Sequence, residues 1–562
     1  MERIWLKEYS PGVPAEADMK QFESIKHILE TSCRRFGDLP AYSSMGATLT
    51  YADLDRLSAA FGAYLQRDLK LAPGDRVAIM MPNVLQYPIA LFGVLRAGFT
   101  VVNVNPLYTA RELQHQLADS GAKVIVVMEN FARTLQDVLA QTPVKHVITT
   151  QIGDMLPGAK RLLVNLVVKH VKKMVPDWRI AGAVDFRQAL SVGGGRSLDD
   201  VNVSHDDLAF LQYTGGTTGV AKGAMLTHGN MVANVQQCSA WMAPFLKEGE
   251  ELMVTPLPLY HIFSLTVNCL LFMKAGGRNH LIANPRDIPN FIKDVKSLQF
   301  TAMTAVNTLY NALLNNPAIT EVDTSRLKLC MGGGMAVQRP VAERWKKVLG
   351  VPIIEGYGLT ETAPVACVNP LHVREFTGKI GLPVPSTEVS IRDDQGREVP
   401  RGEVGEICIR GPQVMKGYWN RPEETAKVMT PDGFFRTGDM GDMDEKGYVR
   451  ITDRKKDMVL VSGFNVYPNE VEDVIAMHDK VLESAVIGIP DAHSGEQVIA
   501  VVVKKDPSLT AEELIKHCRE HLTGYKVPKQ VIFRDEALPK TNVGKVLRRL
   551  LRDEYVKTKA VA

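Results

Sequence analysis

The chain has 562 residues, of which 45% are hydrophobic and 23% charged, a composition typical of a globular protein with more than one domain. The formal net charge of +3 gives no reason to expect a nucleic-acid partner. Seven cysteines without any Cys-x-x-Cys spacing argue against a disulfide scaffold or a zinc site and favour a cytoplasmic location.

Two long uncharged runs, 77–95 and 252–273, have the length of a membrane span. Each contains prolines and polar residues, among them Asn83 and His261, which are unfavourable in a spanning helix. The two runs therefore predict a buried strand, a turn and a buried helix. We expect no membrane-spanning helix.

Short β-branched runs at 77–81, 124–128 and 147–150 alternate with helical patterns at 54–69 and 340–349. This alternation predicts an α/β fold built on largely parallel sheets.

The pattern changes between 378 and 452, where short strands alternate with Gly- and Pro-rich turns and predict a small antiparallel unit. The charged cluster 453–457 follows. Strands and helices then resume in a C-terminal segment that has the size of a small domain.

The segment 160–179, KRLLVNLVVKHVKKMVPDWR, has the pattern of a basic amphipathic helix. Its predicted apolar face holds Leu163, Leu166, Val167, Val171 and Met174, and its basic face holds Lys169, Lys172 and Lys173. Such a helix can lie on an anionic membrane surface. Most amphipathic helices instead pack their apolar side onto the protein body, so this second interpretation is preferred from the sequence.

The run TGGTTGVAKG at 214–223 follows the apolar stretch 208–211 and predicts a strand that ends in a loop around a polyphosphate. Glycines let backbone N–H groups approach phosphates, threonine hydroxyls can reach phosphate oxygens or a metal, and Lys222 supplies a positive charge. The run differs from a Walker A loop because glycine follows the lysine. A plain Gly/Thr linker would explain neither the strand nor the lysine.

Five further motifs follow along the chain. They are EGYGLTE at 355–361, FFRTGD at 434–439, DRKK at 453–456, VSGFNVYP at 461–468 and PKTNVGK at 539–545. Together with the glycine loop, and in this order, they resemble the adenylate-forming superfamily of acyl-CoA synthetases, luciferases and adenylation domains. The block 432–472 is further similar to the signature of fatty acyl-CoA synthetases, in particular of bacterial long-chain fatty acid–CoA ligases.

The resemblance implies an α/β fold in two parts. Residues 1–453 would form a large N-terminal domain of two doubly wound α/β layers with a small β-barrel-like unit. Residues 454–562 would form a small, mobile α+β domain that carries Lys545.

The same resemblance implies ATP, Mg²⁺ and coenzyme A as cofactors and co-substrates. A fatty acid would react with ATP to give acyl-AMP and pyrophosphate, and coenzyme A would then take the acyl group and release AMP. A medium-chain or aryl carboxylate–CoA ligase is the alternative. A homodimer and a peripheral contact of 160–179 with the cytoplasmic face of the membrane are left open.

Catalytic roles are implied for a few residues. Lys545 would bridge the carboxylate and the α-phosphate, Glu361 would hold Mg²⁺ together with Thr217, and Thr360 would donate its hydroxyl to the α-phosphate. His261 would line the acyl site, although a structural buried histidine is nearly as well supported. Taken alone, Thr360 and Glu361 are also compatible with a helix N-terminus.

Further roles are implied for the nucleotide, the thiol and the hinge. Tyr357 would stack on adenine, Asp439 would accept hydrogen bonds from the ribose, and Arg454 would reach the same sugar or a phosphate. Gly463 would leave room for the pantetheine arm, and Lys456 would lie at the hinge. The remaining nucleotide contacts implied are Thr214, Gly215, Gly216, Thr217, Thr218, Gly219, Lys222, Gly332, Gly333, Gly334, Glu355, Gly356 and Gly358.

Overall fold

The computed structural model describes residues 2–214, 221–462, 464–491, 493–541 and 544–561. Within these ranges no helix is both long and apolar enough to cross a bilayer. The run 77–95 forms the strand β3 (Arg76–Met80) and the helix α3 (Gln86–Arg96), as predicted. The run 252–273 likewise begins with a strand, β10 (Leu252–Thr255), and continues after a loop into η5 (Ser264–Leu270) and α9 (Leu271–Lys274).

A seven-stranded sheet forms the first α/β layer, in the order β7-β6-β5-β3-β4-β8-β9. Every neighbouring pair is parallel except β8 and β9. The remaining strands are β4 (Thr100–Asn103), β5 (Val124–Met128), β6 (His146–Thr150), β7 (Val184–Asp185), β8 (Leu208–Thr214) and β9 (Lys222–Thr227). Its helices are α1 (Ile25–Phe36), α2 (Tyr51–Arg67), α4 (Ala110–Ser120), α5 (Ala132–Val138) and α7 (Phe186–Gly194).

Both faces of this sheet are buried, which is why β5 is apolar at every position. Val124 and Val126 pack into the cluster formed with α1, α2, α3 and α7. Ile125 and Val127 face the opposite cluster, which contains residues of α4 and α5. Helices on both faces of a mainly parallel sheet make this layer doubly wound, as expected.

A nine-stranded sheet forms the second layer, in the order β16-β15-β14-β13-β12-β10-β11-β1-β2. The strands other than β10 are β1 (Pro40–Ser44), β2 (Ala47–Thr50), β11 (Arg278–Leu281), β12 (Ala302–Ala305), β13 (Leu329–Gly332), β14 (Ile353–Gly358), β15 (Val365–Val368) and β16 (Leu382–Pro383). One face packs on α8 (His228–Met242), η5 and α9, and the other on α10 (Ile288–Val295), α11 (Asn307–Leu314) and α12 (Arg339–Leu349).

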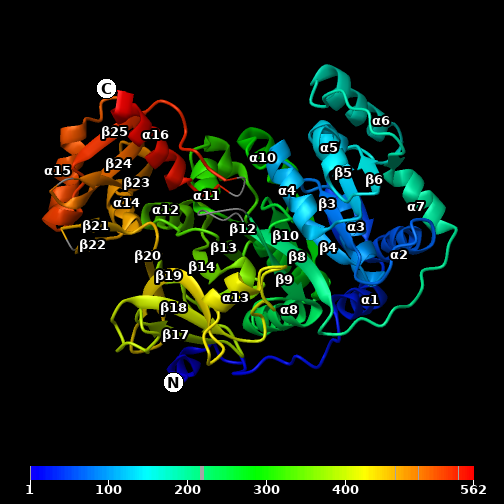
Figure 1. Cartoon of the computed structure of the whole chain (residues 1–562), viewed down its shortest axis with the longest axis horizontal. Helices are drawn as coiled ribbons and strands as arrows, with labels where there is room; N and C mark the ends of the chain where they lie inside the picture. Colours follow the sequence, from blue (N-terminus) through cyan, green and yellow to red (C-terminus); the bar gives the residue numbers. More distant parts are fainter. Residues whose placement is uncertain (1, 215–220, 463, 492, 542–543, 562) are drawn as a thin grey trace.

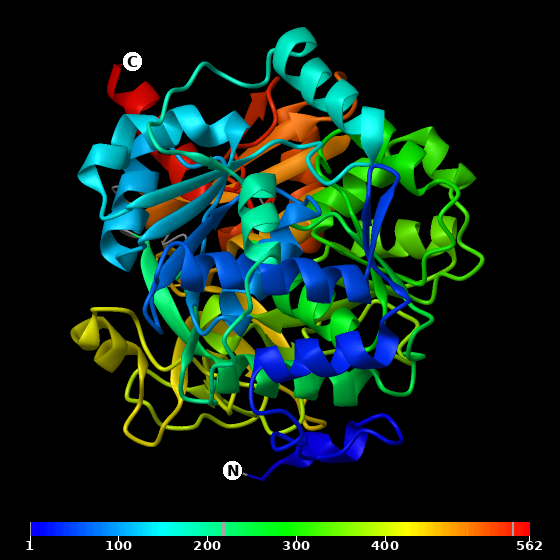
Figure 2. The same cartoon turned by 90° about the vertical axis from the view of Figure 1, so that its right-hand side faces the viewer.

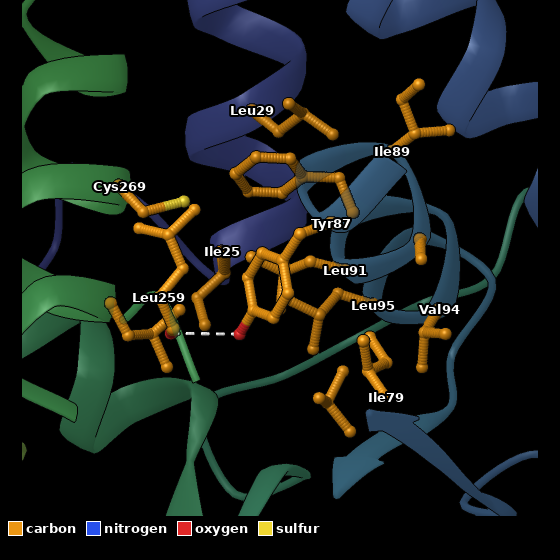
Figure 3. Close-up of a cluster of buried hydrophobic side chains, with 14 of the residues drawn as sticks. Ile25, Leu29, Ile79, Tyr87, Ile89, Leu91, Val94, Leu95, Leu259 and Cys269 are labelled. Atoms are coloured by element: carbon orange, nitrogen blue, oxygen red, sulfur yellow. Dashed lines mark hydrogen bonds between the residues drawn. The ribbon is translucent and has the colours of Figure 1, made fainter. Parts of the chain in front are cut away.

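The core between the two layers fixes the loop that precedes His261. The Tyr87 hydroxyl on α3 donates to the Leu259 carbonyl at 2.9 Å, in a cluster with Ile25 and Cys269 (Figure 3). Asn83, just before α3, bonds to the backbone of Thr255, Leu257 and Leu259. Residues beside and on α3 of the first layer thus hold in place a loop of the second layer, although the two segments are distant in the sequence.

The segment 388–454 forms a four-stranded antiparallel sheet in the order β17-β18-β19-β20. The strands are β17 (Glu388–Arg392), β18 (Gly405–Arg410), β19 (Phe435–Met443) and β20 (Val449–Arg454), with α13 (Pro422–Val428) beside them. In the part of the chain that the structure describes, β17 and β20 are the two edges of the sheet. The predicted antiparallel unit is therefore present as a four-stranded sheet whose outer strands β17 and β20, as far as the described ranges extend, do not pair with each other.

The C-terminal sheet contains five strands among the described residues and lies next to the four-stranded sheet, on the side away from the seven-stranded layer (Figure 1). Its strands are β21 (Val459–Val461), β22 (Phe464–Val466), β23 (Val481–Asp491), β24 (Gly495–Lys504) and β25 (Gln530–Arg534). Its helices are α14 (Pro468–Ala476), α15 (Ala511–His521) and α16 (Arg548–Val561). This α+β arrangement agrees with the prediction.

The amphipathic segment forms α6 (Gly158–Leu166) and the π-helical turn η4 (Val167–Val171) at the periphery of the molecule (Figures 1 and 2). Its leucines point outward, so the interpretation preferred from the sequence was wrong. The helix is attached to the body through Val164 and Asn165, which leaves the apolar arc on the opposite side in solvent. All seven cysteines are buried and free.

Candidate active site

The two ends of the glycine loop lie side by side. β8 ends at Thr214 and β9 begins at Lys222, and these two residues are antiparallel partners. The strand that the sequence predicts before the loop is therefore present, and Lys222 stands at the first position of the return strand. The predicted phosphate contacts Gly215, Gly216, Thr217, Thr218 and Gly219 lie outside the described residues.

The ammonium of Lys222 is held by a segment that sequence reasoning did not single out. Its Nζ lies 2.5 Å from Glu424 Oε2 and 5.1 Å from the centroid of the Tyr418 ring. The segment around Tyr418 reaches this position because it is hydrogen-bonded to β9, through Met225 N to Gly417 O at 2.9 Å and Trp419 N to Gly223 O at 2.8 Å. The signal in the sequence is the run GYWNRPEE at 417–424, but its pairing with β9 is long-range and leaves no local pattern.

Glu361 lies in η7 (Thr360–Thr362), immediately beside this lysine site. Its Oε1 accepts a 2.7 Å hydrogen bond from the Tyr418 hydroxyl, and burial raises the pKa of its carboxyl above the usual range. Thr360 is half-buried in the same turn. With three residues η7 is too short to act as a helix N-terminus, so this structural explanation of Thr360 and Glu361 does not hold.

A magnesium ion is chemically compatible with Glu361, because a carboxylate is a hard oxygen ligand. Among the described residues no group of three or more His, Cys, Asp or Glu side chains could hold a metal ion. Magnesium at Glu361 would therefore take most of its ligands from phosphates and water, which is its usual behaviour at nucleotide sites. The second predicted ligand, Thr217, lies outside the described residues.

A pocket of about 340 Å³ opens beside Glu361. Its lining residues are Glu361, Glu406, Tyr418, Lys427, Val428, Phe435, Arg436, Thr437, Gly438 and Lys455. The pocket extends from Glu361, the candidate magnesium ligand, to the first residues of β19. Asp439 is the next residue after the lining residue Gly438.

Tyr357, Asp439 and Arg454 form one connected group. The Tyr357 hydroxyl donates to Asp439 Oδ2 at 2.6 Å, and Arg454 Nε lies 3.1 Å from Asp439 Oδ1. Asp439 and Arg454 are partners across β19 and β20. Burial and the Asp439 carboxylate raise the pKa of Tyr357 well above its usual value, so the phenol stays protonated and acts as a donor.

The predicted glycines line the ends of β13 and β14, where the backbone is closely approached. Gly332 is the register partner of Glu355. A Cβ at Gly333 would lie 3.0 Å from the ring of Phe263, and a Cβ at Gly358 would lie 1.9 Å from the Pro364 carbonyl oxygen. Gly334 lies two residues after the end of β13, and Gly356 lies within β14. Packing therefore requires at least Gly358, and a contact with adenine stays a prediction.

Glu355 is buried against the C-terminal part of the chain. Burial, with a smaller effect of the Asp473 carboxylate on α14, raises the pKa of Glu355 to about 8, while a hydrogen bond to the backbone at Val337 and the charge of Arg339 lower it. The pKa of Asp473 is raised to about 7 by burial and by Glu472. Glu355 of β14 and Asp473 of α14 thus form a pair of buried carboxyls whose pKa values are both raised.

Lys545 belongs to the same site although it lies near the C-terminus. Burial lowers the pKa of Lys545 to about 8; the Arg454 charge lowers it too, whereas Asp439 raises it. Burial and then the Lys545 charge lower the pKa of His261 to about 4, so this imidazole is neutral at physiological pH. The loop of Lys545 touches the large body where Thr308 Oγ1 donates to Gly544 O at 3.4 Å.

Lys456 lies in the turn between β20 and β21, where the chain leaves the four-stranded sheet for the C-terminal sheet. This is the position that a hinge requires. Gly463, the predicted thiol-channel residue, lies outside the described residues.

The fold and this group of residues define an AMP-binding enzyme. The profile of the AMP-binding enzyme family matches residues 29–419 and that of the AMP-binding enzyme C-terminal domain matches residues 470–545, so the chain belongs to this family. The resemblance inferred from the motifs is confirmed.

Particular relatives are named as ligases. The chain is 58% identical to the long-chain-fatty-acid–CoA ligase of Yersinia pestis and 56% identical to that of Haemophilus influenzae, over 99% of both chains in each comparison. Its fold is similar to ATP-bound MatB from Rhodopseudomonas palustris, with a TM-score of 0.78 and 30% identity over 95% of this chain and 99% of MatB.

Proposed function

We propose that this chain is a long-chain fatty acid–CoA ligase that depends on ATP and magnesium. It forms an acyl-AMP from the acid and ATP with release of pyrophosphate, and then transfers the acyl group to coenzyme A with release of AMP. The full-length relatives that carry this name support the substrate class. The observation that carries the mechanism is that the loop of Lys545 reaches the large domain, where Thr308 Oγ1 donates to Gly544 O at 3.4 Å, with Lys545 buried and in electrostatic contact with Asp439, Arg454 and His261.

The first half-reaction brings two anions together, the carboxylate of the acid and the triphosphate of ATP. Cations and oriented donors have to offset this repulsion. Lys222 at the base of the glycine loop faces the β- and γ-phosphates, and Lys545 bridges the carboxylate and the α-phosphate. Magnesium at Glu361, when bound, neutralises phosphate charge.

The nucleoside is held at the other end of the site. Asp439 accepts hydrogen bonds from the ribose hydroxyls, and the Tyr357 ring, whose hydroxyl is held by Asp439, lies under adenine. Arg454 balances the charge of Asp439 and stays within reach of the sugar or a phosphate.

The second half-reaction needs the coenzyme A thiol where Lys545 stood. Residues 454–562 rotate as a unit about the turn that contains Lys456, and this motion withdraws Lys545. Neutral His261 lines the acyl side of the site without adding charge.

A substrate panel tests this function. The full chain is incubated with ATP, Mg²⁺ and coenzyme A and with palmitate, decanoate, hexanoate or benzoate, and the thioester is identified by mass spectrometry. The highest kcat/KM is expected for palmitate. Activity confined to benzoate and related aromatic acids would replace the fatty-acid assignment by an aryl carboxylate–CoA ligase, and the absence of pyrophosphate release with all acids would overturn the proposal.

A further inference from the structure

The outer face of α6 and η4 combines apolar exposure with positive charge. Among the described residues, five of the fifteen exposed large hydrophobic side chains lie on this one helix and the eight residues that follow it. They are Leu162 (63% exposed), Leu163 (63%), Leu166 (55%), Val171 (67%) and Met174 (54%). We call these five residues the outer apolar face.

This exposure is a fixed feature of the fold, since polar contacts hold the helix in one orientation. Asn165 Oδ1 accepts from Gly153 N at 2.7 Å, and Lys160 Nζ donates to Met45 O at 2.5 Å. Near the other end, Asn130 Nδ2 donates to Met174 O at 3.0 Å. Val164, on the inner side, packs against the main core. The leucines cannot turn inward without breaking these contacts.

The charges within the segment that carries the outer apolar face all have one sign. From 158 to 174 the sequence contains lysines and one arginine but no acidic residue. Lys169 is partly engaged, with Nζ 3.5 Å from Glu129 Oε2. Lys172 and Lys173 are exposed, and no salt bridge of either is found among the described residues. The electrostatic partner that fits is therefore an extended anionic surface.

We propose that the outer apolar face and Lys172 and Lys173 form a docking surface for an anionic lipid bilayer. The aliphatic side chains enter the boundary between headgroups and acyl chains, and the lysines contact the anionic headgroups. This is the chemistry expected of an amphipathic helix that lies in the membrane plane. It places α6 and η4 against the membrane and the rest of the molecule above it, and it does not depend on the identity of the substrate.

Sedimentation with vesicles tests the surface directly. The full chain, without ATP or acid, is mixed with vesicles of phosphatidylcholine alone or with phosphatidylglycerol added. Binding is expected only with phosphatidylglycerol, and it should weaken as salt rises because the attraction is screened. Equal binding to both vesicles, or no binding to either, would overturn the proposal.

Two sets of variants separate the apolar and the electrostatic parts. The variant Leu162→Gln, Leu163→Gln, Leu166→Gln should lose binding, whereas Leu107→Gln, Val348→Gln, Val404→Gln, which changes three exposed apolar residues elsewhere, should bind as the unaltered chain does. Lys172→Glu, Lys173→Glu should weaken partition by more than about fivefold per lysine. The matched variant Lys293→Glu, Lys347→Glu, with the same change in net charge, should not.

A site-specific probe excludes other occupants of the surface. Because every cysteine of the chain is buried, Leu166→Cys introduces a single accessible thiol for an environment-sensitive fluorophore. Its emission should shift to the blue on addition of phosphatidylglycerol vesicles. A shift without lipid, together with a dimer that the three leucine substitutions dissolve, would show that a second copy of the chain covers the face and would overturn the proposal.

Discussion

Lys222, the first residue of β9, is ion-paired with Glu424 of α13, with Nζ and Oε2 2.5 Å apart. The hydrogen bond from Lys222, with a second from Lys427, lowers the pKa of Glu424 to about 2. The carboxylate thus holds the lysine of the glycine loop beside Tyr418, and Tyr418 in turn holds Glu361. One chain of contacts connects Lys222, the proposed phosphate contact, to the candidate magnesium ligand.

Substitution of either residue of this ion pair should change the KM for ATP more than the KM for the acid. Lys222→Ala should raise KM for ATP by about 10- to 100-fold, the usual worth of a charge-assisted contact. Glu424→Gln should raise it only about two- to fivefold, because a half-exposed ion pair contributes little beyond positioning. Steady-state kinetics at saturating acid measures both. Glu423→Gln is the control, and a lower KM for Glu424→Gln would mean that the carboxylate competes with ATP.

Lys545 should be required for the first half-reaction, the formation of acyl-AMP, and not for the second. Lys545→Ala should slow acyl-AMP formation by about a hundredfold or more, as expected when a group that stabilises transition-state charge is removed. Thioester formation from a supplied acyl-AMP should be largely unchanged. Pyrophosphate exchange and single-turnover assays separate the two steps. Lys540→Ala, in the same motif but paired with Glu483, should leave both steps intact, and equal loss of both steps in Lys545→Ala would contradict the assignment.

Glu355 should make folding stability depend on pH. Its pKa is about 8 in the folded chain, whereas an unfolded glutamate ionises near pH 4.5. Between these pH values the carboxyl is ionised in the unfolded chain and protonated in the folded chain. The contribution of Glu355 to the free energy of unfolding is therefore fully present below about pH 4.5 and decreases as the pH rises to 8. Glu355→Gln should flatten this fall.

Thermal unfolding at pH 5 and pH 8 measures the effect. The melting temperature of Glu355→Gln relative to the unaltered chain should be higher at pH 8 than at pH 5. The exposed Glu403 provides the comparison, since Glu403→Gln should shift the melting temperature equally at both pH values. An unchanged slope for Glu355→Gln would show that this carboxyl is ionised in the folded chain.

Gly358 should tolerate no side chain. A Cβ there would lie 1.9 Å from the Pro364 carbonyl oxygen, which is backbone and cannot move aside alone. Gly358→Ala should lower the melting temperature and displace η7 with Glu361, so that activity and stability fall together. Gly356→Ala is the matched control for stability, because its Cβ would meet neighbours only at 3.6 Å. Similar melting temperatures for the two variants would contradict this account.

The local sequence pattern was sufficient to predict several helices and strands and to recognise the motifs of the site in their order. Apolar runs predicted β5 and β8, and the amphipathic pattern predicted α12 to within one residue. Two features could not be read locally. The direction of the leucines on α6 depends on Asn165 and Val164 facing the body, and the place of Tyr418 and Glu424 depends on pairing with β9, far away in the sequence.

The buried cysteines have a consequence for an enzyme that produces an activated acyl group. Burial raises the pKa of Cys238, Cys269 and Cys330 to about 12, so these thiols stay protonated and are poor nucleophiles. An acyl-AMP that escapes the site would meet no competing thiolate among the chain's own cysteines. Self-acylation at sulfur is thereby suppressed, and the incoming cosubstrate remains the preferred sulfur acceptor.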